Sequence, residues 1–354
     1  MIFFIGPKLK PITGQAMAFN MAFTHYLGGK RVFYYEGSNG GVLTVIFKNL
    51  FLFFLFLYHF IFNFRDVKCV YLTTSRSLTG FIRDALFILT CRLFKVRIVN
   101  HLHGADFINF RDSLKWPFKS IVDFVYSKID TSIVLMLKMK EQYAMYDGMK
   151  VVSISNCAPP MSNLPKKHSD SLKILYLSNI MYSKGVLFVI EAVDNLIKLG
   201  IDVQLTIAGS PMGDEYKTSE EIQLIFKEMI TGKDYIDYLG TVTGIIKEQL
   251  LADSDVFVLP SFYRTEAQPI SILEAMLSGS AIITTNHNYL SDLINSNNGF
   301  VVEPRSAKGI ETSILELIND KSKLESISVY NKDYAEKHYS LETYVNQISK
   351  VINN

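Results

Sequence analysis

This sequence of 354 residues contains only three cysteines, and it has no uninterrupted hydrophobic run of membrane-spanning length. The three cysteines exclude a disulfide scaffold and a cysteine-based zinc site, and they fit a reducing cytosol. The first residues, MIFFIGP, have neither a basic n-region nor a small-residue cleavage site, so no secretory signal is expected. With 49% hydrophobic residues the chain can bury a large core, and its length predicts two domains.

The longest apolar run covers residues 50–62 and contains one clearly polar side chain, His59. A membrane span needs about 20 apolar residues, whereas this run of 13 is closed by Lys48 and Asn49 before it and by Arg65 after it. We therefore interpret the run as a helix of the first domain that touches lipid with one side, not as a span.

Charge and phenylalanine are both distributed unevenly. Residues 1–160 carry 19 Lys and Arg against 9 Asp and Glu, whereas residues 161–354 carry 17 against 25. Of the 25 phenylalanines, 20 lie before residue 161. A basic, aromatic-rich half favours a membrane surface over nucleic acid as its anionic partner. The alternative is a Phe-rich core with a coincidental charge bias.

Short apolar segments alternate with helical patterns along the chain, which predicts an α/β fold with parallel sheets covered on both faces. Residues 156–170 have linker composition and divide the chain into two doubly wound, Rossmann-like domains, residues 1–160 and 161–354. The last helix, about residues 340–354, is expected to pack back on the first domain. Ligands of such sheets bind at the carboxyl ends of the strands, so we expect the site in a central cleft between the two domains. The expected strands are residues 2–5, 31–35, 67–73, 96–100, 131–135, 151–154, 172–177, 203–208, 235–239, 256–259, 281–284 and 300–302.

The strongest local signal is residues 255–285, DVFVLPSFYRTEAQPISILEAMLSGSAIITT. A buried strand leads through a loop to a helix that has Pro269 in its first turn and Gly279 just past its end. The start of such a helix offers free N–H groups to an anion such as a diphosphate. Glu266 and Glu274 could then accept hydroxyl groups of a sugar and a ribose. The alternative is one acid favoured by the helix dipole and one exposed helix acid.

The Glu-x7-Glu pattern of Glu266 and Glu274 resembles that of retaining glycosyltransferases of family 4, which have the GT-B fold. Three further segments resemble motifs of that family and extend the likeness over most of the chain. They are PITGQAMAF (residues 11–19), similar to its first glycine loop; HLHGAD (101–106), similar to its His-Gly turn; and SNIMYSKG (178–185), similar to its phosphate loop.

The resemblance implies a role for each matching position. Glu266 would hold hydroxyls of the donor sugar, Glu274 the ribose, and Lys184 the diphosphate. In the first domain, Gly14 would allow the backbone to approach the phosphates closely, and His103 would face the donor sugar. Further donor-binding positions would be Asn179 in the phosphate loop, Thr241 and Val242 at the base, and the segment made of Ala267, Gln268, Pro269, Ile270 and Ser271.

The sequence departs from the family pattern in two places. Where the family has a Gly-Arg pair ahead of the lysine, this chain has Ser178 and Asn179, and Arg264 is a candidate replacement for the missing cation. The first glycine loop has one glycine, Gly14, instead of a pair.

No metal is expected. Asp253 and Asp255 are spaced like the metal-binding acid pair of the other large glycosyltransferase fold. However, Asp253 is expected to end a helix and Asp255 to begin a strand. No Ser-His-Asp arrangement stands out. Of His101 and His103, which alternate, one is expected to be turned into the structure.

The resemblance implies a metal-independent, retaining hexosyltransferase that uses a nucleotide sugar, most often a UDP-sugar, with no other cofactor. The hydrophobic, basic first half suggests a lipid-linked glycan acceptor, as in O-antigen, other lipopolysaccharide or capsule synthesis. It also suggests a cytoplasmic protein held peripherally on the inner face of the plasma membrane, with no nucleic-acid partner. The alternatives are a nucleotide-sugar epimerase of the same fold and a non-catalytic membrane-bound scaffold.

Overall fold

The computed structural model describes residues 1–354 except 11–12, 37–40, 163 and 168–169. The chain forms two compact units. The first unit comprises Met1–Asn156 and Leu341–Asn354, and the second comprises Cys157–Ser340. The division falls at 156/157 instead of the expected 160/161, because the buried Cys157 and the Ala158 amide, which donates to the Tyr339 carbonyl (2.9 Å), already belong to the second unit.

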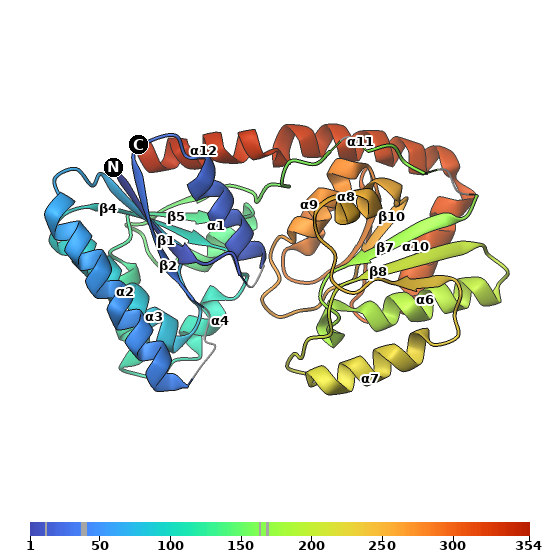
Figure 1. The fold of residues 1–354 in the computed structure, drawn as a ribbon, viewed down its shortest axis with the longest axis horizontal. Helices are drawn as coiled ribbons and strands as arrows, with labels where there is room; N and C mark the ends of the chain where they lie inside the picture. Colours follow the sequence, from blue (N-terminus) through green and yellow to red (C-terminus); the bar gives the residue numbers. More distant parts are fainter. Residues whose placement is uncertain (11–12, 37–40, 163, 168–169) are drawn as a thin grey trace. The chain divides into compact units, whose positions relative to one another are not determined.

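The first unit is built around a parallel sheet in the order β2-β1-β3-β4-β5-β6 (Figure 1). Its strands match the expected segments closely, because apolar β-rich runs separated by helical patterns define a parallel sheet. They are β1 (Ile2–Pro7), β2 (Lys30–Tyr35), β3 (Cys69–Leu72), β4 (Arg97–Leu102), β5 (Thr131–Val134) and β6 (Lys150–Ser153).

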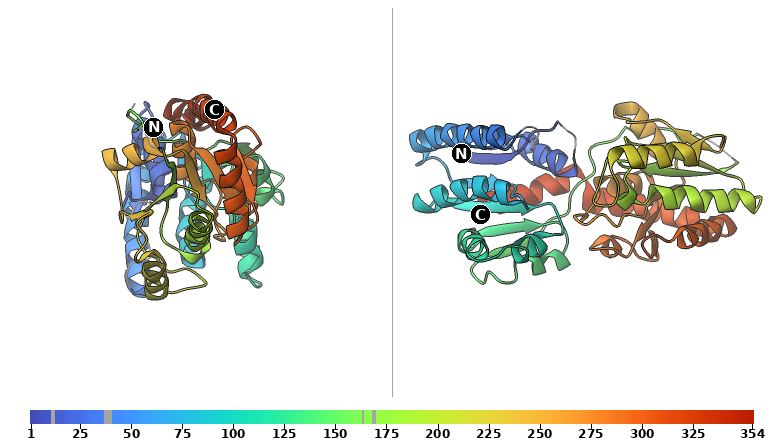
Figure 2. Two further views of the ribbon diagram at one scale, coloured as in Figure 1. Left: turned by 90° about the vertical axis from the view of Figure 1, so that its right-hand side faces the viewer. Right: turned by 90° about the horizontal axis from the view of Figure 1, so that it is seen from below.

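Helices cover both faces of this sheet. Helices α1 and α12 contact each other, and on the other face α3 contacts both α2 and α5; Figure 2 shows α2 and α3 running side by side. The helical segments are α1 (Gly14–His25), α2 (Val42–Asn63), α3 (Leu78–Leu93), α4 (Phe107–Asp112), α5 (Phe118–Tyr126), the 3-10 helix η1 (Lys138–Tyr143) and α12 (Leu341–Asn353).

Two neighbouring phenylalanines of β1 divide the core of the first unit into two layers. Side chains alternate between the faces of a strand, so Phe3 packs against Phe56 and Phe60 of α2. Phe4 points to the other face and packs against Phe19 and Phe23 of α1. Part of the phenylalanine excess in this half of the chain is therefore ordinary core.

The last helix, α12, belongs to the first unit. Tyr344 is buried and donates a hydrogen bond to the Ala18 carbonyl of α1 (3.0 Å). Arg97 of β4 donates to the carbonyls of Val351 and Ile352.

Helix α2 is longer than the apolar run in the sequence. It begins at Val42, so it includes Lys48 and the apolar residues before it. Among the described residues, one helix, Thr44–Asn63, is long and apolar enough to cross a membrane, with a mean hydropathy of 2.0 and 17% of its window buried. The expectation that the apolar stretch is too short to span was based on its first polar neighbours, but one lysine does not interrupt a helix.

Two faces of α2 have different surroundings. Leu52, Phe56 and Phe60 recur every four residues and are buried, which is the spacing of one helix face. A second set on α2 is exposed and lies at a similar spacing: Phe47, Phe51, Phe54, Tyr58 and Phe62. Helix α2 is thus a packed crossover helix with an apolar outer surface.

The second unit contains a parallel sheet in the order β12-β11-β10-β7-β8-β9. Its strands are β7 (Leu172–Leu177), β8 (Val203–Ala208), β9 (Ile236–Tyr238), β10 (Val256–Leu259), β11 (Ala281–Thr285) and β12 (Gly299–Val302). Its helical segments are η2 (Tyr182–Lys184), α6 (Val186–Lys198), α7 (Ser219–Ile230), α8 (Gly244–Asp253), α9 (Ile270–Ser278), η3 (Leu290–Leu293), α10 (Ala307–Asn319) and α11 (Lys321–Tyr339).

The strand order reverses between β7 and β10. In a doubly wound sheet this reversal leaves a crevice outside the carboxyl ends of the two central strands, and ligands bind there. The doubly wound α/β architecture expected from the sequence is therefore confirmed, and the reversal marks where to look for a site in the second unit.

Phe56→Ala tests whether α2 is an integral part of the first unit. Phe56 is fully buried and contacts Phe3, Phe33 and Phe87, so its removal should lower the free energy of unfolding by about 3–5 kcal/mol in urea titrations. The matched change Phe54→Ala, on the same helix but 63% exposed, should cost less than about 1 kcal/mol. Equal losses would contradict the two-faced packing of α2.

Candidate functional site

An ion pair between Lys184 and Glu266 stands at the carboxyl ends of β7 and β10. Lys184 ends the short helix η2 after β7, and Glu266 lies in the loop after β10. The lysine ammonium contacts Oε2 of the carboxylate, and the Ser261 hydroxyl donates to the same oxygen at 2.8 Å. Both charged side chains are mostly buried, with 13% and 10% of the lysine and glutamate side chains exposed. The two residues singled out in separate motifs are therefore direct neighbours.

Gly185 allows these two loops to approach. It has φ = +81°, and a Cβ at this position would lie 2.4 Å from the Pro260 carbonyl oxygen, which is a backbone atom and cannot move away. The Phe262 amide also donates to the Ser183 carbonyl at 2.7 Å. Only glycine meets both the left-handed conformation and the close backbone contact, so the glycine that follows Lys184 sets the distance from Lys184 to Glu266.

The loop that carries Lys184 is held by Asp214. One of its oxygens accepts a hydrogen bond from the Ser183 amide (2.6 Å), and the other accepts from the amides of Tyr216 and Lys217. These hydrogen bonds lower the pKa of Asp214 against the effect of its partial burial. The sequence motifs gave no signal for this residue, since it lies in an irregular segment between β8 and α7.

Helix α9 begins directly after Glu266. Pro269 is its N-cap residue with an extended conformation, one position earlier than the sequence suggested, and Gly279 ends it at φ = +86°. The first amides of a helix have no carbonyl partner one turn back, so those of Ile270 and Ser271 are available to an anion. Ala267 and Gln268 are buried between Glu266 and this helix start.

Glu274 is buried on α9 and paired with a lysine that the motifs did not reveal. Lys247 of α8 contacts Oε1 at 2.5 Å, whereas Oε2 is buried and without a hydrogen-bond partner among the described residues. Burial raises the pKa of Glu274, and Lys247 opposes that rise. Glu274 is therefore not the exposed helix acid of the alternative interpretation, and it presents an unused acceptor oxygen.

Thr241 and Val242, the residues expected at the base, lie on the loop after β9, and the loops after β7 and β8 lie beside it. Gly209, after β8, has φ = +153°, and a Cβ there would lie 1.9 Å from the Ser178 carbonyl oxygen. Its amide donates to the Gly240 carbonyl at 2.8 Å. Thr241 shares a hydrogen bond with Ser210, and Asn179 and Thr241 are exposed, with Val242 half-buried.

One arginine lies in the loop after β10 and another in the segment after β12. Arg264 is exposed, and its carbonyl accepts a hydrogen bond from Asn288. Arg305, after β12, has φ = +64° and lies over three aromatic rings at centroid distances of 4.7–5.9 Å: those of Tyr182, Tyr216 and Phe262. The replacement role suggested for Arg264 stays a prediction.

In the first unit, the His-Gly turn follows β4. His101 is fully buried and hydrogen-bonded through Nδ1 to the Tyr71 hydroxyl (2.6 Å), so it is the histidine turned into the structure. The ring of His103 lies 4.0 Å from that of His101. Burial of its ring nitrogens, together with the nearby Arg76 charge, lowers the pKa of His103 to about 3. His103 is therefore neutral at physiological pH.

Arg76 also shapes the turn itself. Its guanidinium pairs with Asp106, and a Cβ at Gly104 would lie 2.3 Å from Arg76 Cζ. The glycine of the turn thus leaves room for the arginine, which the sequence motifs did not single out.

Gly14 is the first residue of α1, not part of the loop before it, and the Thr13 side chain accepts the Ala16 amide at the N-cap. Pro11 and Ile12, the first residues of the predicted glycine loop, lie outside the described residues.

The described residues contain no group of three or more His, Cys, Asp or Glu side chains that could hold a metal ion. Asp253 accepts from the Lys167 amide and Asp255 accepts from the Lys173 amide. The two acids thus bind the segment that leads into β7.

Comparison with known proteins bears mainly on the second unit. Residues 162–334 match the family model of glycosyl transferases group 1, in agreement with the resemblance noted in the sequence. An uncharacterised glycosyltransferase of Methanocaldococcus jannaschii is 28% identical over 152 residues, 43% of this chain and 37% of that protein. The capsular polysaccharide biosynthesis glycosyltransferase CapM of Staphylococcus aureus is 26% identical over 186 residues, 52% of this chain and 47% of CapM.

The similarity of fold extends over the whole chain. HepE of Anabaena, crystallised in complex with UDP, superposes with a TM-score of 0.74 at 15% identity and covers 99% of each chain. The protein therefore has the GT-B fold. The sequence matches are narrower, because they span only 37% to 47% of the length of the curated relatives.

The depressed pKa of His103 predicts acid sensitivity. An unfolded histidine binds its proton near pH 6.5 and the folded one only near pH 3, so below pH 6.5 the unfolded state holds more protons and stability falls with pH. His103 alone should remove about 2–3 kcal/mol between pH 7 and pH 4.5. Urea unfolding of His103→Gln at both pH values should show that much less acid destabilisation than the unaltered protein; parallel curves would contradict a neutral His103.

Proposed function

We propose that this protein is a retaining glycosyltransferase that moves a sugar from a nucleotide sugar, namely a UDP-sugar, to a lipid-linked glycan in surface-polysaccharide synthesis. The observation that carries the proposal is the Lys184–Glu266 pair at the strand-order reversal, beside the start of α9. The family match, the capsule synthesis named for CapM and the UDP complex of HepE support it.

The donor diphosphate is proposed to bind between Lys184 and the first amides of α9. A cation and a helix N-terminus together neutralise a diphosphate without a metal. Lys184 is paired with Glu266 in this structure, so an arriving diphosphate competes for the ammonium. The carboxylate that shares its lysine can then accept hydroxyls of the donor sugar, while Ser261 keeps it in place.

Glu274 is proposed to bind the ribose. Its Oε1 is held by Lys247, and its Oε2 is the buried acceptor without a partner among the described residues. A ribose hydroxyl would supply the missing donor. The base would lie along Asn179, Thr241 and Val242, which belong to loops at the same edge of the sheet.

Within the first unit, His103 and Gly14 keep the roles that the resemblance implies, toward the donor sugar and the phosphates. Since His103 is neutral, it would act as a hydrogen-bonding group and not as a cation.

Transfer with retention is proposed to occur by attack on the front face. The bond from the anomeric carbon to the diphosphate oxygen breaks, the bond to the acceptor oxygen forms on the same face, and the acceptor proton passes to the leaving phosphate. Glu266 does not need to be a nucleophile, because Lys184 and Ser261 already engage one of its oxygens. Lys184 stabilises the charge that develops on the leaving group.

The protein is proposed to lie peripherally on the cytoplasmic face of the plasma membrane through the outer surface of α2. Residues 42–63 contain no Asp or Glu, and exposed cations follow that helix, namely Arg65 and Lys68. An aromatic surface flanked by cations is typical of an interfacial helix. The packing of Phe56 and Phe60 on the sheet supports a helix that lies along the membrane instead of crossing it.

The central test is incubation with labelled nucleotide sugars, with and without a polyprenyl diphosphate glycan. Acceptor-dependent transfer with retained anomeric configuration is expected, and it should continue in excess EDTA because Lys184 and α9 neutralise the diphosphate. Isomerisation of the free nucleotide sugar would instead indicate an epimerase. A lack of turnover with every donor would indicate a non-catalytic scaffold. A loss in EDTA that manganese alone restores would contradict the metal-independent site.

The two glutamates are expected to affect different kinetic constants. Glu274→Ala should raise KM for the donor with little change in kcat, since the ribose does not change during transfer. Glu266→Ala should mainly lower kcat. Loss of a charged hydrogen bond is worth about 1.5–3 kcal/mol, so tenfold to hundredfold effects are expected. Glu311→Ala is the control, since Glu311 is a buried, lysine-paired acid of α10; if all three variants behave alike, the assignment is wrong.

Membrane association should depend on the outer surface of α2. Phe54→Asp combined with Phe62→Asp is expected to reduce co-sedimentation with anionic vesicles by at least about tenfold, because both side chains are well exposed, at 63% and 74%. The control pair, Leu224→Asp with Val329→Asp, changes equally exposed apolar residues of the second unit and should bind as the unaltered protein does. High salt should weaken binding. Failure to sediment at low salt would contradict the proposal.

A further inference from the structure

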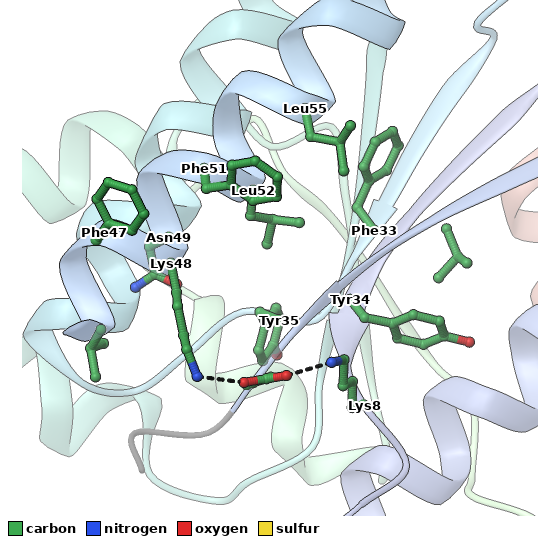
Figure 3. Close-up of a pocket in the computed structure, with 13 residues that line it drawn as sticks. Lys8, Phe33, Tyr34, Tyr35, Phe47, Lys48, Asn49, Phe51, Leu52 and Leu55 are labelled. Carbon is green, nitrogen blue, oxygen red and sulfur yellow. Dashed lines mark hydrogen bonds and ion pairs between the residues drawn. The ribbon is translucent and has the colours of Figure 1, made fainter. Parts of the chain in front are cut away.

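A cavity of about 450 Å³ lies in the first unit between α2 and the edge strand β2. Figure 3 shows Phe33 and Tyr35 of β2 on one side and side chains of α2 on the other, with the Tyr34 ring pointing away from α2. The α2 residues on its wall are mainly apolar: Val45, Phe47, Phe51, Leu52 and Leu55. Its size is that of a site for a single small ligand, and its lining suits a hydrocarbon chain.

Two lysines stand at one end of this cavity. Lys8 and Lys48 both pair with the carboxylate of Glu36, Lys48 at 2.7 Å (Figure 3). Hydrogen bonds from Lys48 and Lys8 lower the pKa of Glu36 to about 2, so the three groups carry one net positive charge. Each ammonium has three N–H donors and uses one on Glu36. The remaining donors can bind a second anion.

The cavity joins two surfaces that the proposed reaction needs. Phe47 and Phe51 line it and are also 73% and 64% exposed on the outer face of α2. Lys8 follows the carboxyl end of β1 and Glu36 that of β2, the edge at which ligands bind in such sheets. A ligand could therefore extend its chain toward the proposed membrane face while its polar end stays at the ligand-binding edge of the sheet.

We propose that this cavity binds the first isoprenoid units of a polyprenyl-linked acceptor, with the acceptor's phosphate held by Lys8 and Lys48. The proposal rests on the lipid-linked acceptor of the proposed function and names where its lipid is recognised. A cavity of about 450 Å³ has room for one short hydrocarbon segment and is too small for both acyl chains of a bilayer phospholipid. Charge-assisted hydrogen bonds from the two ammonium groups provide the affinity for the phosphate.

The test measures binding of a photoreactive farnesyl monophosphate to the full chain in detergent, without any sugar donor. Mass spectrometry should map the crosslinks to α2 and β2. Phe51→Ala should weaken binding by about tenfold, whereas Phe54→Ala, equally exposed on α2 but outside the cavity, should not. Both variants lose one exposed phenylalanine, so a general loss of lipid affinity would affect them equally.

The lysines are tested in the same way. Lys8→Gln combined with Lys48→Gln should weaken binding of the farnesyl monophosphate at least about tenfold and leave binding of farnesol unchanged. The control pair Lys140→Gln with Lys150→Gln removes two exposed cations of the first unit outside the cavity and should behave as the unaltered protein.

Three outcomes would overturn the proposal: equal competition by a phosphatidic acid, full protection by inorganic phosphate, or crosslinks outside α2 and β2. Thermal stabilisation by UDP, measured on the same variants, separates this proposal from the proposed function. If the unaltered protein binds UDP but not farnesyl phosphate, the proposed role of the cavity alone is refuted. If it binds neither, the proposed transferase function is refuted as well.

Discussion

The contact between the loop after β7 and the loop after β10 determines the candidate donor site. At Gly185 the backbone of one loop lies against the Pro260 carbonyl of the other, at a distance that a Cβ would not permit. Because of this approach, Lys184 meets Glu266, and Glu266 leads directly into the start of α9. Cation, carboxylate and helix amides are thus brought together by one glycine, with Asp214 fixing the loop from the other side.

Burial shifts the pKa values of two candidate site residues, Glu274 in the second unit and His103 in the first. Glu274 has one oxygen on Lys247 and one without a partner among the described residues, in surroundings that raise its pKa. An unsatisfied buried acceptor is costly, and such a cost is commonly repaid when a ligand supplies the donor. His103 shows the same effect with the opposite shift, since loss of water makes its neutral form the stable one and so lowers its pKa.

The first unit serves two purposes with one abundant residue type. Phe3 and Phe4 face opposite sides of the sheet and pack against the helices there, while the phenylalanines on the outer face of α2 are exposed among the described residues. The excess of phenylalanine noted in the sequence therefore has two physical explanations at once, core packing and an exposed apolar surface. Neither the core interpretation nor the membrane interpretation accounts for all of it.

The order of strands and helices, the two units and the positions of Lys184, Glu266 and Glu274 could be predicted from the sequence, because hydrophobic periodicity and loop motifs are local properties of the chain. The sequence also indicated Gly279 as the end of α9, since only glycine readily takes a left-handed conformation there. It did not reveal Lys247, Arg76 or the cavity beside β2. Those depend on side chains from separate elements, because the packing of the folded chain selects which distant residues meet and how completely water is excluded between them.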